Sequence, residues 1–126
     1  MRKKRFGVSI PIELAEELDK LANILACDRS RLVTHALRSI ISEYKHYGKP
    51  HHCLGVIICT KPIGKTKSME FVEEFRDIIK SYNHIHVRDL CIELYIVEGD
   101  SRRISRLHSK LDKSSNFVKY IPLLAE

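Results

Sequence analysis

One short strand followed by two helices makes up the first 48 residues, and this imbalance limits what the chain can fold into. Apolar and polar side chains alternate over residues 5–10, as they do in an amphipathic strand. Pro11 is expected to begin the first helix, and Asp28 is expected to cap a second helix over residues 29–47. Because a lone strand has two unpaired edges and so short a unit cannot bury a core, we expect it to pair with the same strand of a second chain.

Two such strands would form a ribbon of the size that enters the major groove of DNA. The segment resembles the ribbon-helix-helix family of transcription factors, which implies a homodimer through residues 1–48 that binds double-stranded DNA. In that family the outward strand positions contact bases, and the start of the second helix holds a phosphate. The matching positions are Arg5, Gly7 and Ser9 on the strand and Arg29 and Ser30 at the helix start, with Lys3 and Lys4 adding phosphate affinity.

The charge of the chain fits a nucleic-acid partner. Its formal net charge is +6, and the basic residues are densest at residues 2–5. No apolar run is long enough to cross a membrane, and no apolar stretch follows the basic start as it would in a secretory signal. We therefore expect a cytoplasmic protein whose four cysteines are thiols or metal ligands and do not form disulfides.

A Gly- and Pro-containing linker at residues 49–52 separates this segment from a second domain at residues 53–126. The expected elements of that domain are a strand at 54–60, a helix at 68–82, strands at 84–88 and 91–98, a helix at 101–113 and a strand at 117–124. This β-α-β-β-α-β order is typical of ferredoxin-like and ACT-like domains. The predicted fold class is α+β, a βαα ribbon-helix-helix domain followed by a βαββαβ domain.

The predicted hairpin of the second domain has two chemically different faces. If His86 lies opposite Cys91, the apolar side chains of Ile85, Val87, Leu90, Ile92, Leu94 and Ile96 share one face, which we expect to pack on the helices. The other face then carries His84, His86, Cys91, Glu93 and Tyr95, and we expect it to be open.

Two imidazoles and a thiol on one face are the chemistry of a transition-metal site, formed here by His84, His86 and Cys91. A planar arrangement favours Ni²⁺ or Cu²⁺, and a tetrahedral one favours Zn²⁺. The alternative is that His84, His86 and Cys91 are ordinary residues on a solvent-exposed face and bind no metal. The sequence contains no signature of a catalytic dyad, a catalytic triad or a phosphate-binding loop, so we do not expect an enzyme.

The combination of these two domains with His-x-His and a following Cys resembles the nickel-responsive regulator family, a resemblance that includes the segment CIELYIVEGD. The resemblance implies a homotetramer formed through the C-terminal domains, with Ni²⁺ bound at His84, His86 and Cys91. It also implies that nickel strengthens operator binding and represses transcription. Cu²⁺, Co²⁺ and Zn²⁺ are the alternative metals.

The chain departs from that family at the metal site. Four residues separate His86 from Cys91 where the family has five, and residues 79–82 contain no counterpart of the family's fourth ligand, a histidine. Either another group completes the site, or the site has three ligands, or the metal is not nickel. The candidate substitutes are Glu93, His51, His52 and Cys53.

The sequence is also compatible with two functions other than nickel-responsive regulation. The second domain could be a metal-independent oligomerisation or small-ligand module attached to the DNA-binding segment. The chain could also be a metal-trafficking protein with an incidental basic arm. Outside the predicted metal site, His35, His46 and His108 are expected near the surface, and Cys27 and Cys59 are expected to act as small apolar residues.

Overall fold

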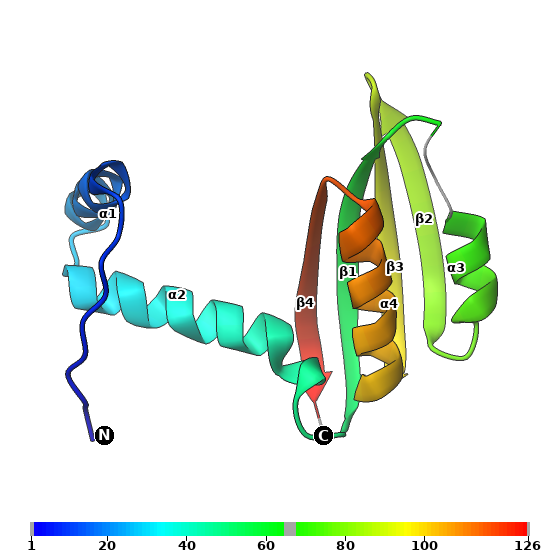
Figure 1. Cartoon of the computed structure of the whole chain (residues 1–126), viewed down its shortest axis with the longest axis horizontal. Coiled ribbons are helices and arrows are strands. Elements are labelled where there is room, and N and C mark those ends of the chain that lie inside the picture. The colour runs from blue at the N-terminus through cyan, green and yellow to red at the C-terminus, as the bar shows by residue number, and fades with distance from the viewer. Residues whose placement is uncertain (1, 65–67, 126) are drawn as a thin grey trace. The chain divides into compact units, whose positions relative to one another are not determined.

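The computed structural model describes residues 2–64 and 68–125, without the side chains of residues 68 and 125 (Figure 1). Its elements are α1 (Ile12–Ile24), α2 (Arg29–Tyr44), the short 3-10 helix η1 (Lys45–Tyr47), β1 (His52–Pro62), α3 (Ser68–Glu74), β2 (Ile79–Val87), β3 (Leu90–Asp100), α4 (Ser101–Ser114) and β4 (Phe117–Ala125). The chain divides into two compact units, Met1–Ser39 and Ile40–Glu126. The division into functional domains at residues 1–48, 49–52 and 53–126 stays a prediction.

The first unit begins its helices where the sequence indicates. Pro11 is the N-cap of α1, and its carbonyl accepts a hydrogen bond from the Ala15 N–H at 3.1 Å. The Asp28 carboxylate accepts one from the Arg31 N–H at 2.7 Å, which confirms Asp28 as the cap of α2. Residues 5–10 form no strand ladder within this single chain. Their pairing in a ribbon with a second chain stays a prediction.

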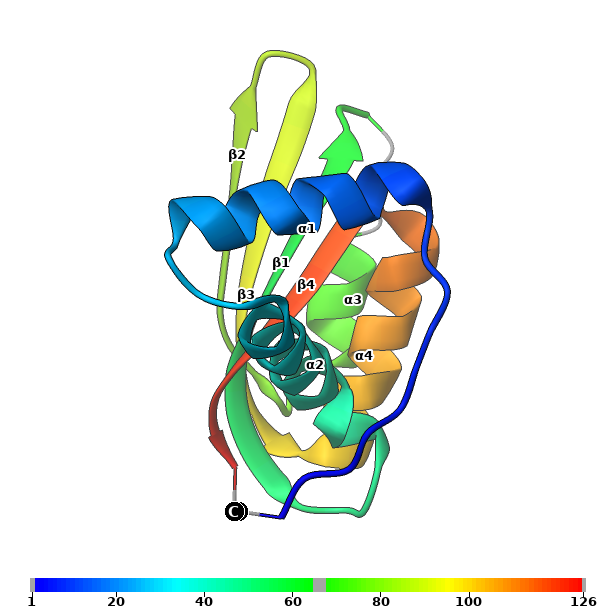
Figure 2. The same ribbon diagram turned by 90° about the vertical axis from the view of Figure 1, so that its left-hand side faces the viewer.

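The second unit contains a four-stranded antiparallel sheet in the order β2-β3-β1-β4. Helices α3 and α4 both lie on one face of this sheet (Figure 2), so the ferredoxin-like βαββαβ arrangement is confirmed. The core lies between that face and the helices. Its fully buried apolar members are Ile57, Cys59, Phe75, Tyr95, Val97, Ile104, Leu107 and Leu111. Within the unit Ile40–Glu126, no helix of the described residues covers the other face of the sheet.

The predicted helix at residues 68–82 is only half correct. Helix α3 ends at Glu74, and the carbonyl of Phe75 accepts hydrogen bonds from the N–H groups of Ile78 and Ile79 at 3.0 Å each. Strand β2 then begins at Ile79, which pairs with Val97 of β3. The apolar residues over this segment fit a helical period, but the ladder that β2 forms with β3 between Ile79 and Val87 outweighs that local pattern.

The two faces of the hairpin are sorted as predicted, but their orientation is the reverse of the expectation. Cys91, Glu93, Tyr95 and Val97 are buried under the helices, whereas the alternating residues Ile92, Leu94 and Ile96 lie on the uncovered face. The prediction was wrong because it assigned the more apolar face to the core. Both faces are largely apolar, since the uncovered one also carries Leu54, Val56 and Ile58 of β1.

The expectation that His46 and His108 lie near the surface was also wrong. Both imidazoles are buried, and His46 Nε2 shares a 2.7 Å hydrogen bond with His108 Nδ1. Burial lowers the pKa of His46 to about 4, with a further contribution from the neighbouring His108. Burial also lowers the pKa of His108. The rings of Tyr44, Tyr47 and Tyr120 surround the pair, with centroids 4.4 to 6.1 Å from one imidazole or the other.

Candidate metal site and nucleic-acid interface

The register of the sheet places four potential metal ligands at adjacent positions of the hairpin. His86 of β2 pairs with Cys91 of β3, and His84 pairs with Glu93. Directly opposite residues of antiparallel strands project from the same face of a sheet, and residues two apart on a strand do as well. The two imidazoles, the thiol and the carboxylate therefore lie on one face. This confirms the predicted pairing of His86 with Cys91.

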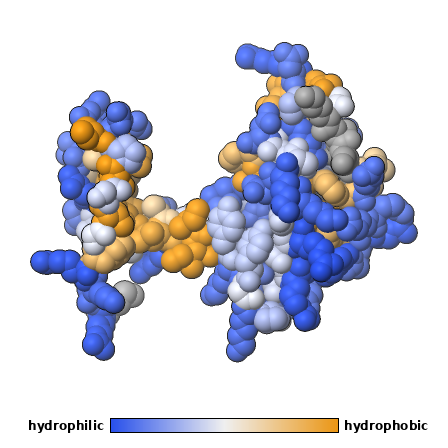
Figure 3. All heavy atoms as spheres, viewed as in Figure 1, coloured by the Kyte–Doolittle hydropathy of each residue, from blue (hydrophilic) through white to orange (hydrophobic). Residues whose placement is uncertain are grey.

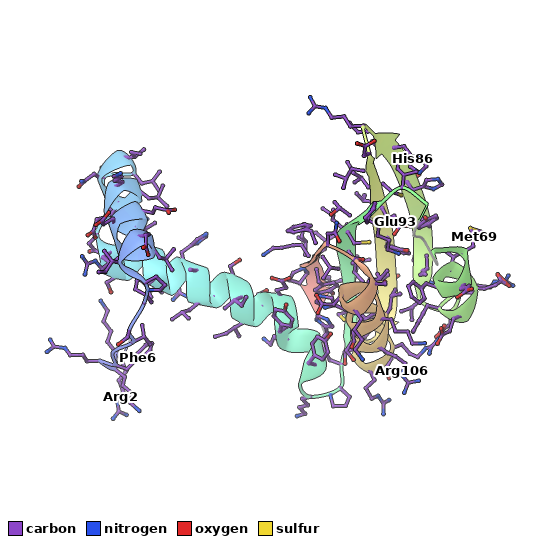
Figure 4. All side chains as sticks on the ribbon, turned by 45° about the horizontal axis from the view of Figure 1, so that its top comes forward. Arg2, Phe6, Met69, His86, Glu93 and Arg106 are labelled. Atoms are coloured by element: carbon purple, nitrogen blue, oxygen red, sulfur yellow. The ribbon has the colours of Figure 1, made fainter. Side chains whose placement is uncertain are left out.

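The two histidines form the exposed side of this group. Both imidazoles are accessible to solvent, and their ring centroids are 5.6 Å apart. Tyr82 continues the row on β2, with its ring centroid 5.7 Å from that of His84. Figure 4 shows His86 near the turn of the hairpin and Glu93 further along the sheet. Solvent therefore reaches the site from the side of the imidazoles.

The thiol and the carboxylate form the buried side. Cys91 is only 3% exposed, and burial raises the pKa of its thiol, with the Glu93 carboxylate adding to the effect. Tyr82 donates a 2.6 Å hydrogen bond to Glu93 Oε2, and Cys59 donates a 3.4 Å hydrogen bond to Oε1. Burial raises the pKa of Cys59 to about 12. Cys59 is therefore a thiol, as expected for a structural cysteine.

Lys61 is the residue of this region that the sequence analysis missed. Its ammonium lies 3.0 Å from Glu93 Oε1, and both side chains are 0% exposed. Lys61 pairs with Cys91 across β1 and β3, so it stands in the same row as His86. The predicted strand ended at Thr60, which assigned Lys61 to a turn. No sequence signal indicated Lys61, because both alternating sets of residues in β1 are largely apolar, and only the burial pattern of the folded strand extends to position 61.

The fit to a metal ion is therefore partial. No group of three or more His, Cys, Asp or Glu side chains in residues 2–64 and 68–125 is close enough to hold an ion as the side chains stand. The three predicted ligands nevertheless share one face and two adjacent rows, with donors suited to Ni²⁺, Cu²⁺ or Zn²⁺. Of the candidate substitutes, Glu93 belongs to this group. His51 and His52 are instead bonded to the Lys49 carbonyl at 2.8 Å and to Glu98 at 3.2 Å.

A basic groove lies beside the start of α2 in the first unit. Lys3, Lys4, Arg31, His35 and Arg38 line it together with Asp28, Ser30 and Thr34. Ser30 occupies the first turn of α2, as expected for a phosphate-holding position. Arg29 is bound to Asp19, with Nη2 to Oδ1 at 2.8 Å, and is thus held at the junction of the two helices. The strand positions Arg5, Gly7 and Ser9 are exposed.

The first unit also leaves most of its apolar side chains uncovered (Figure 3). An apolar groove between the N-terminal segment and the two helices is lined by Val8, Ile10, Leu14, Leu18, Leu21, Ile24, Leu32, Val33, Ala36 and Leu37. Ala22 is the one apolar residue that is buried among those described in Met1–Ser39. An exposed apolar groove on a unit with so little buried surface is typical of a surface that another protein chain covers.

Comparison with known proteins decides the family. A model described as the NikR C terminal nickel binding domain matches residues 64–123. A protein of Methanosarcina acetivorans named "Putative nickel-responsive regulator 2" is 31% identical over 121 residues, which cover 88% of this chain and 86% of the relative. The chain belongs to the nickel-responsive regulator family.

A second relative matches over a similar length, and a solved structure matches a smaller part of the chain. A "Putative nickel-responsive regulator" of Saccharolobus solfataricus is 27% identical over 121 residues, which cover 94% of this chain and 91% of the relative. A solved structure of an uncharacterized protein from Thermotoga maritima matches with a TM-score of 0.49 and 22% identity, covering 60% of this chain and 100% of its own.

Membership in the nickel-responsive regulator family confirms two expectations from the sequence. The first is the resemblance itself, and the second is that the chain is a regulator and not an enzyme. The family also supports Ni²⁺ as the metal. The individual ligands and DNA contacts stay predictions. Among the described residues, no helix is long and apolar enough to cross a membrane.

Proposed function

We propose that the chain is a nickel-responsive DNA-binding transcriptional repressor of the cytoplasm. The observation that carries this proposal is the hairpin register, which puts His84, His86 and Cys91 on one face in a member of this family. Bound Ni²⁺ would supply a fixed charge that draws these donors together. The same metal bound by a rigid hairpin could then favour one arrangement of the DNA-binding units over another.

DNA binding is assigned to residues 1–48. Paired strands of a homodimer present Arg5, Gly7 and Ser9 to base edges, where Arg5 and Ser9 carry the reading because Gly7 has no side chain. Lys3, Lys4, Arg29 and Ser30 hold phosphates. The basic groove beside α2 and the uncovered apolar groove support this assignment. The first provides positive charge, and the second provides the surface that a dimer buries.

Tetramer formation is assigned to the uncovered face of the sheet. Apolar residues occupy neighbouring positions on β1 and β3 there, among them Val56, Ile58, Leu94 and Ile96. A patch of this kind on a soluble domain marks an interface with another protein. Two sheets stacked through these faces would join two dimers into a homotetramer.

Nickel can change DNA binding only if it binds the DNA-competent arrangement more tightly than the alternative. The test is a titration of the full chain with Ni²⁺ against a competing chelator. One high-affinity site per chain is expected, and it is lost in His86→Ala and in Cys91→Ala. His35→Ala, which removes an exposed histidine of α2, is the matched control and leaves nickel affinity unchanged. Equal affinity in all four proteins would refute the assignment of the site.

One observation favours a second candidate function. The Lys61–Glu93 ion pair fills the buried side of the site, and no described group of three ligands stands ready to hold a metal. A regulator whose second domain only assembles the oligomer, without metal, would have this appearance. It predicts no stoichiometric binding of Ni²⁺, Cu²⁺, Co²⁺ or Zn²⁺ in the same titration.

A further inference from the structure

The first turn of α2 carries charges that work against the helix. Arg29 and Arg31 lie in this turn, which contains no acidic side chain. The N-terminal end of a helix has a partial positive charge, so acidic residues stabilise it and basic residues do not. Asp19 neutralises Arg29 through contacts of 2.8 to 3.0 Å. In the part of the chain that the structure describes, the side chain of Arg31 forms no ion pair with an acidic residue.

Arg31 also occupies the position of a residue that would complete the helix cap. The Asp28 carboxylate accepts a hydrogen bond from the Arg31 N–H at 2.7 Å, which is one half of a capping box. The other half needs a glutamate or glutamine side chain at the position of Arg31. The chain therefore lacks a stabilising contact that this position could provide. A residue that departs from a local rule in this way is expected where it serves binding.

Arg31 is the first of a row of side chains on one face of α2. Thr34, His35 and Arg38 follow it at distances of three, four and seven residues, and residues so spaced share one side of a helix. All are exposed, and they line the basic groove together with two lysines of the N-terminal segment. The row is about 10 Å long, at about 1.5 Å per residue. It is long enough to face more than one phosphate, because a DNA strand carries one charge about every 3.4 Å of the duplex axis.

We propose that Arg31 and Arg38 bind phosphates of the DNA backbone along this face of α2, beyond the phosphate held at the start of the helix. The inference rests on the proposed DNA-binding function and extends its contact surface. Thr34 and His35 lie between the two arginines and can donate hydrogen bonds to the same phosphates. A phosphate beside Arg31 supplies the negative charge that the first turn of α2 lacks. Because phosphates carry no sequence information, the row adds the same affinity for every DNA sequence.

Arg31→Glu separates the stability of the helix from DNA binding. Glutamate at this position completes the capping box and suits the charge of the helix end, so the variant is at least as stable as the unaltered chain in urea unfolding. The same change puts an anion in the basic groove, so the affinity of the full chain for a mixed-sequence DNA duplex falls at least tenfold. A purely structural role of Arg31 predicts that DNA affinity follows stability.

The salt dependence of DNA affinity counts the phosphate contacts that are lost. Fluorescence anisotropy of a labelled mixed-sequence duplex measures the affinity of the full chain with Ni²⁺ over a range of salt concentrations. Each arginine that leaves a phosphate lowers the slope of log affinity against log salt by about one. Arg31→Gln and Arg38→Gln each lower the slope by about two for a bound dimer, which loses one contact in each chain. Arg31→Lys keeps the charge and retains most of the slope.

Two arginines outside the row provide the controls. Arg106 is exposed on α4 (Figure 4), and Arg106→Gln leaves the slope unchanged. Arg5 is assigned to base reading, so Arg5→Gln weakens binding to a selected operator more than binding to the mixed-sequence duplex. Arg38→Gln weakens both by the same factor. An equal loss of slope in Arg106→Gln would assign the effect to the net charge of the chain and overturn the inference.

The outcomes separate this inference from the function on which it rests. If the unaltered chain binds the duplex with a steep salt dependence and Arg31→Gln and Arg38→Gln keep the same slope, the row does not contact phosphates, while the DNA-binding function stands. If the unaltered chain binds no duplex at any salt concentration, both are refuted. A slope that falls in these two variants and not in Arg106→Gln supports the inference.

Discussion

Acidification should destabilise the unit Ile40–Glu126 through its buried histidine pair. His46 has a pKa of about 4 in the folded chain, against an ordinary value of 6.5. The unfolded chain regains the ordinary value and so binds more protons between these two pH values. The stability that His46 contributes is therefore fully present above pH 6.5 and is lost as the pH falls toward 4. The lowered pKa of His108 acts in the same direction.

The size of the effect follows from the pKa of His46. A fall from 6.5 to about 4 corresponds to about 3 kcal/mol, at about 1.4 kcal/mol for each pKa unit. About 2 kcal/mol of this is lost between pH 7.5 and pH 5, because protonation of the unfolded chain is nearly complete at pH 5 while the folded imidazole remains mostly neutral. This is a large share of the 5–15 kcal/mol by which a typical domain is stable.

Urea unfolding at fixed protein concentration measures this loss, with tyrosine fluorescence as the signal because the chain has no tryptophan. His46→Gln removes the titrating group and keeps a polar side chain beside His108. It should lower stability at pH 7.5 and reduce the loss on acidification by at least half. His35→Gln, at an exposed position of α2, is the control and should follow the unaltered chain.

Two results would refute this reasoning. One is a stability that does not change between pH 7.5 and pH 5. The other is a full loss in His46→Gln, which would assign the acid sensitivity to other groups. Glu43, His51 and Asp112 act electrostatically on one imidazole of the pair or the other and would be the next to examine.

Three further substitutions test the packing and the assembly. Gly55→Ala should cost about 1–3 kcal/mol in urea unfolding, because the added Cβ would lie 2.5 Å from the Tyr120 ring; an unchanged midpoint would show that the ring moves freely. Leu37→Glu places a charge in the apolar groove of the first unit and should reduce the proposed tetramer to dimers held through the sheet face in sedimentation velocity. Leu94→Lys, on the uncovered face of the sheet, should stop assembly at the dimer, and a persistent tetramer would exclude that face as the interface.

The fold could be predicted from the sequence wherever local signals and tertiary pairing agree. Asp28 caps a helix because its carboxylate satisfies a free N–H, and the pairing of His86 with Cys91 follows from a tight hairpin. The end of α3 could not be predicted, because the pairing of Ile79 with Val97 outweighs a helical pattern that Tyr82 continues by coincidence of spacing. Contacts distant in sequence decide such boundaries.

The residues of the candidate metal site could be predicted from the sequence, but the side chains buried next to them could not. Alternation alone sorted the hairpin into two faces, yet it could not say which face the helices cover when both are largely apolar. Lys61 was missed because a charged residue after a run of strand residues is usually exposed. Only the register shows that its ammonium reaches Glu93 inside the covered face.

The central claim is that nickel bound at the hairpin controls DNA binding. The most direct measurement is selection of duplexes from a random-sequence DNA library by the full chain, with and without Ni²⁺, followed by affinity measurement on the selected duplex. The account predicts a defined operator that is bound at least tenfold more tightly with Ni²⁺, and no nickel effect in Cys91→Ala. An equal affinity with and without Ni²⁺, or the same nickel effect in Cys91→Ala, would contradict it.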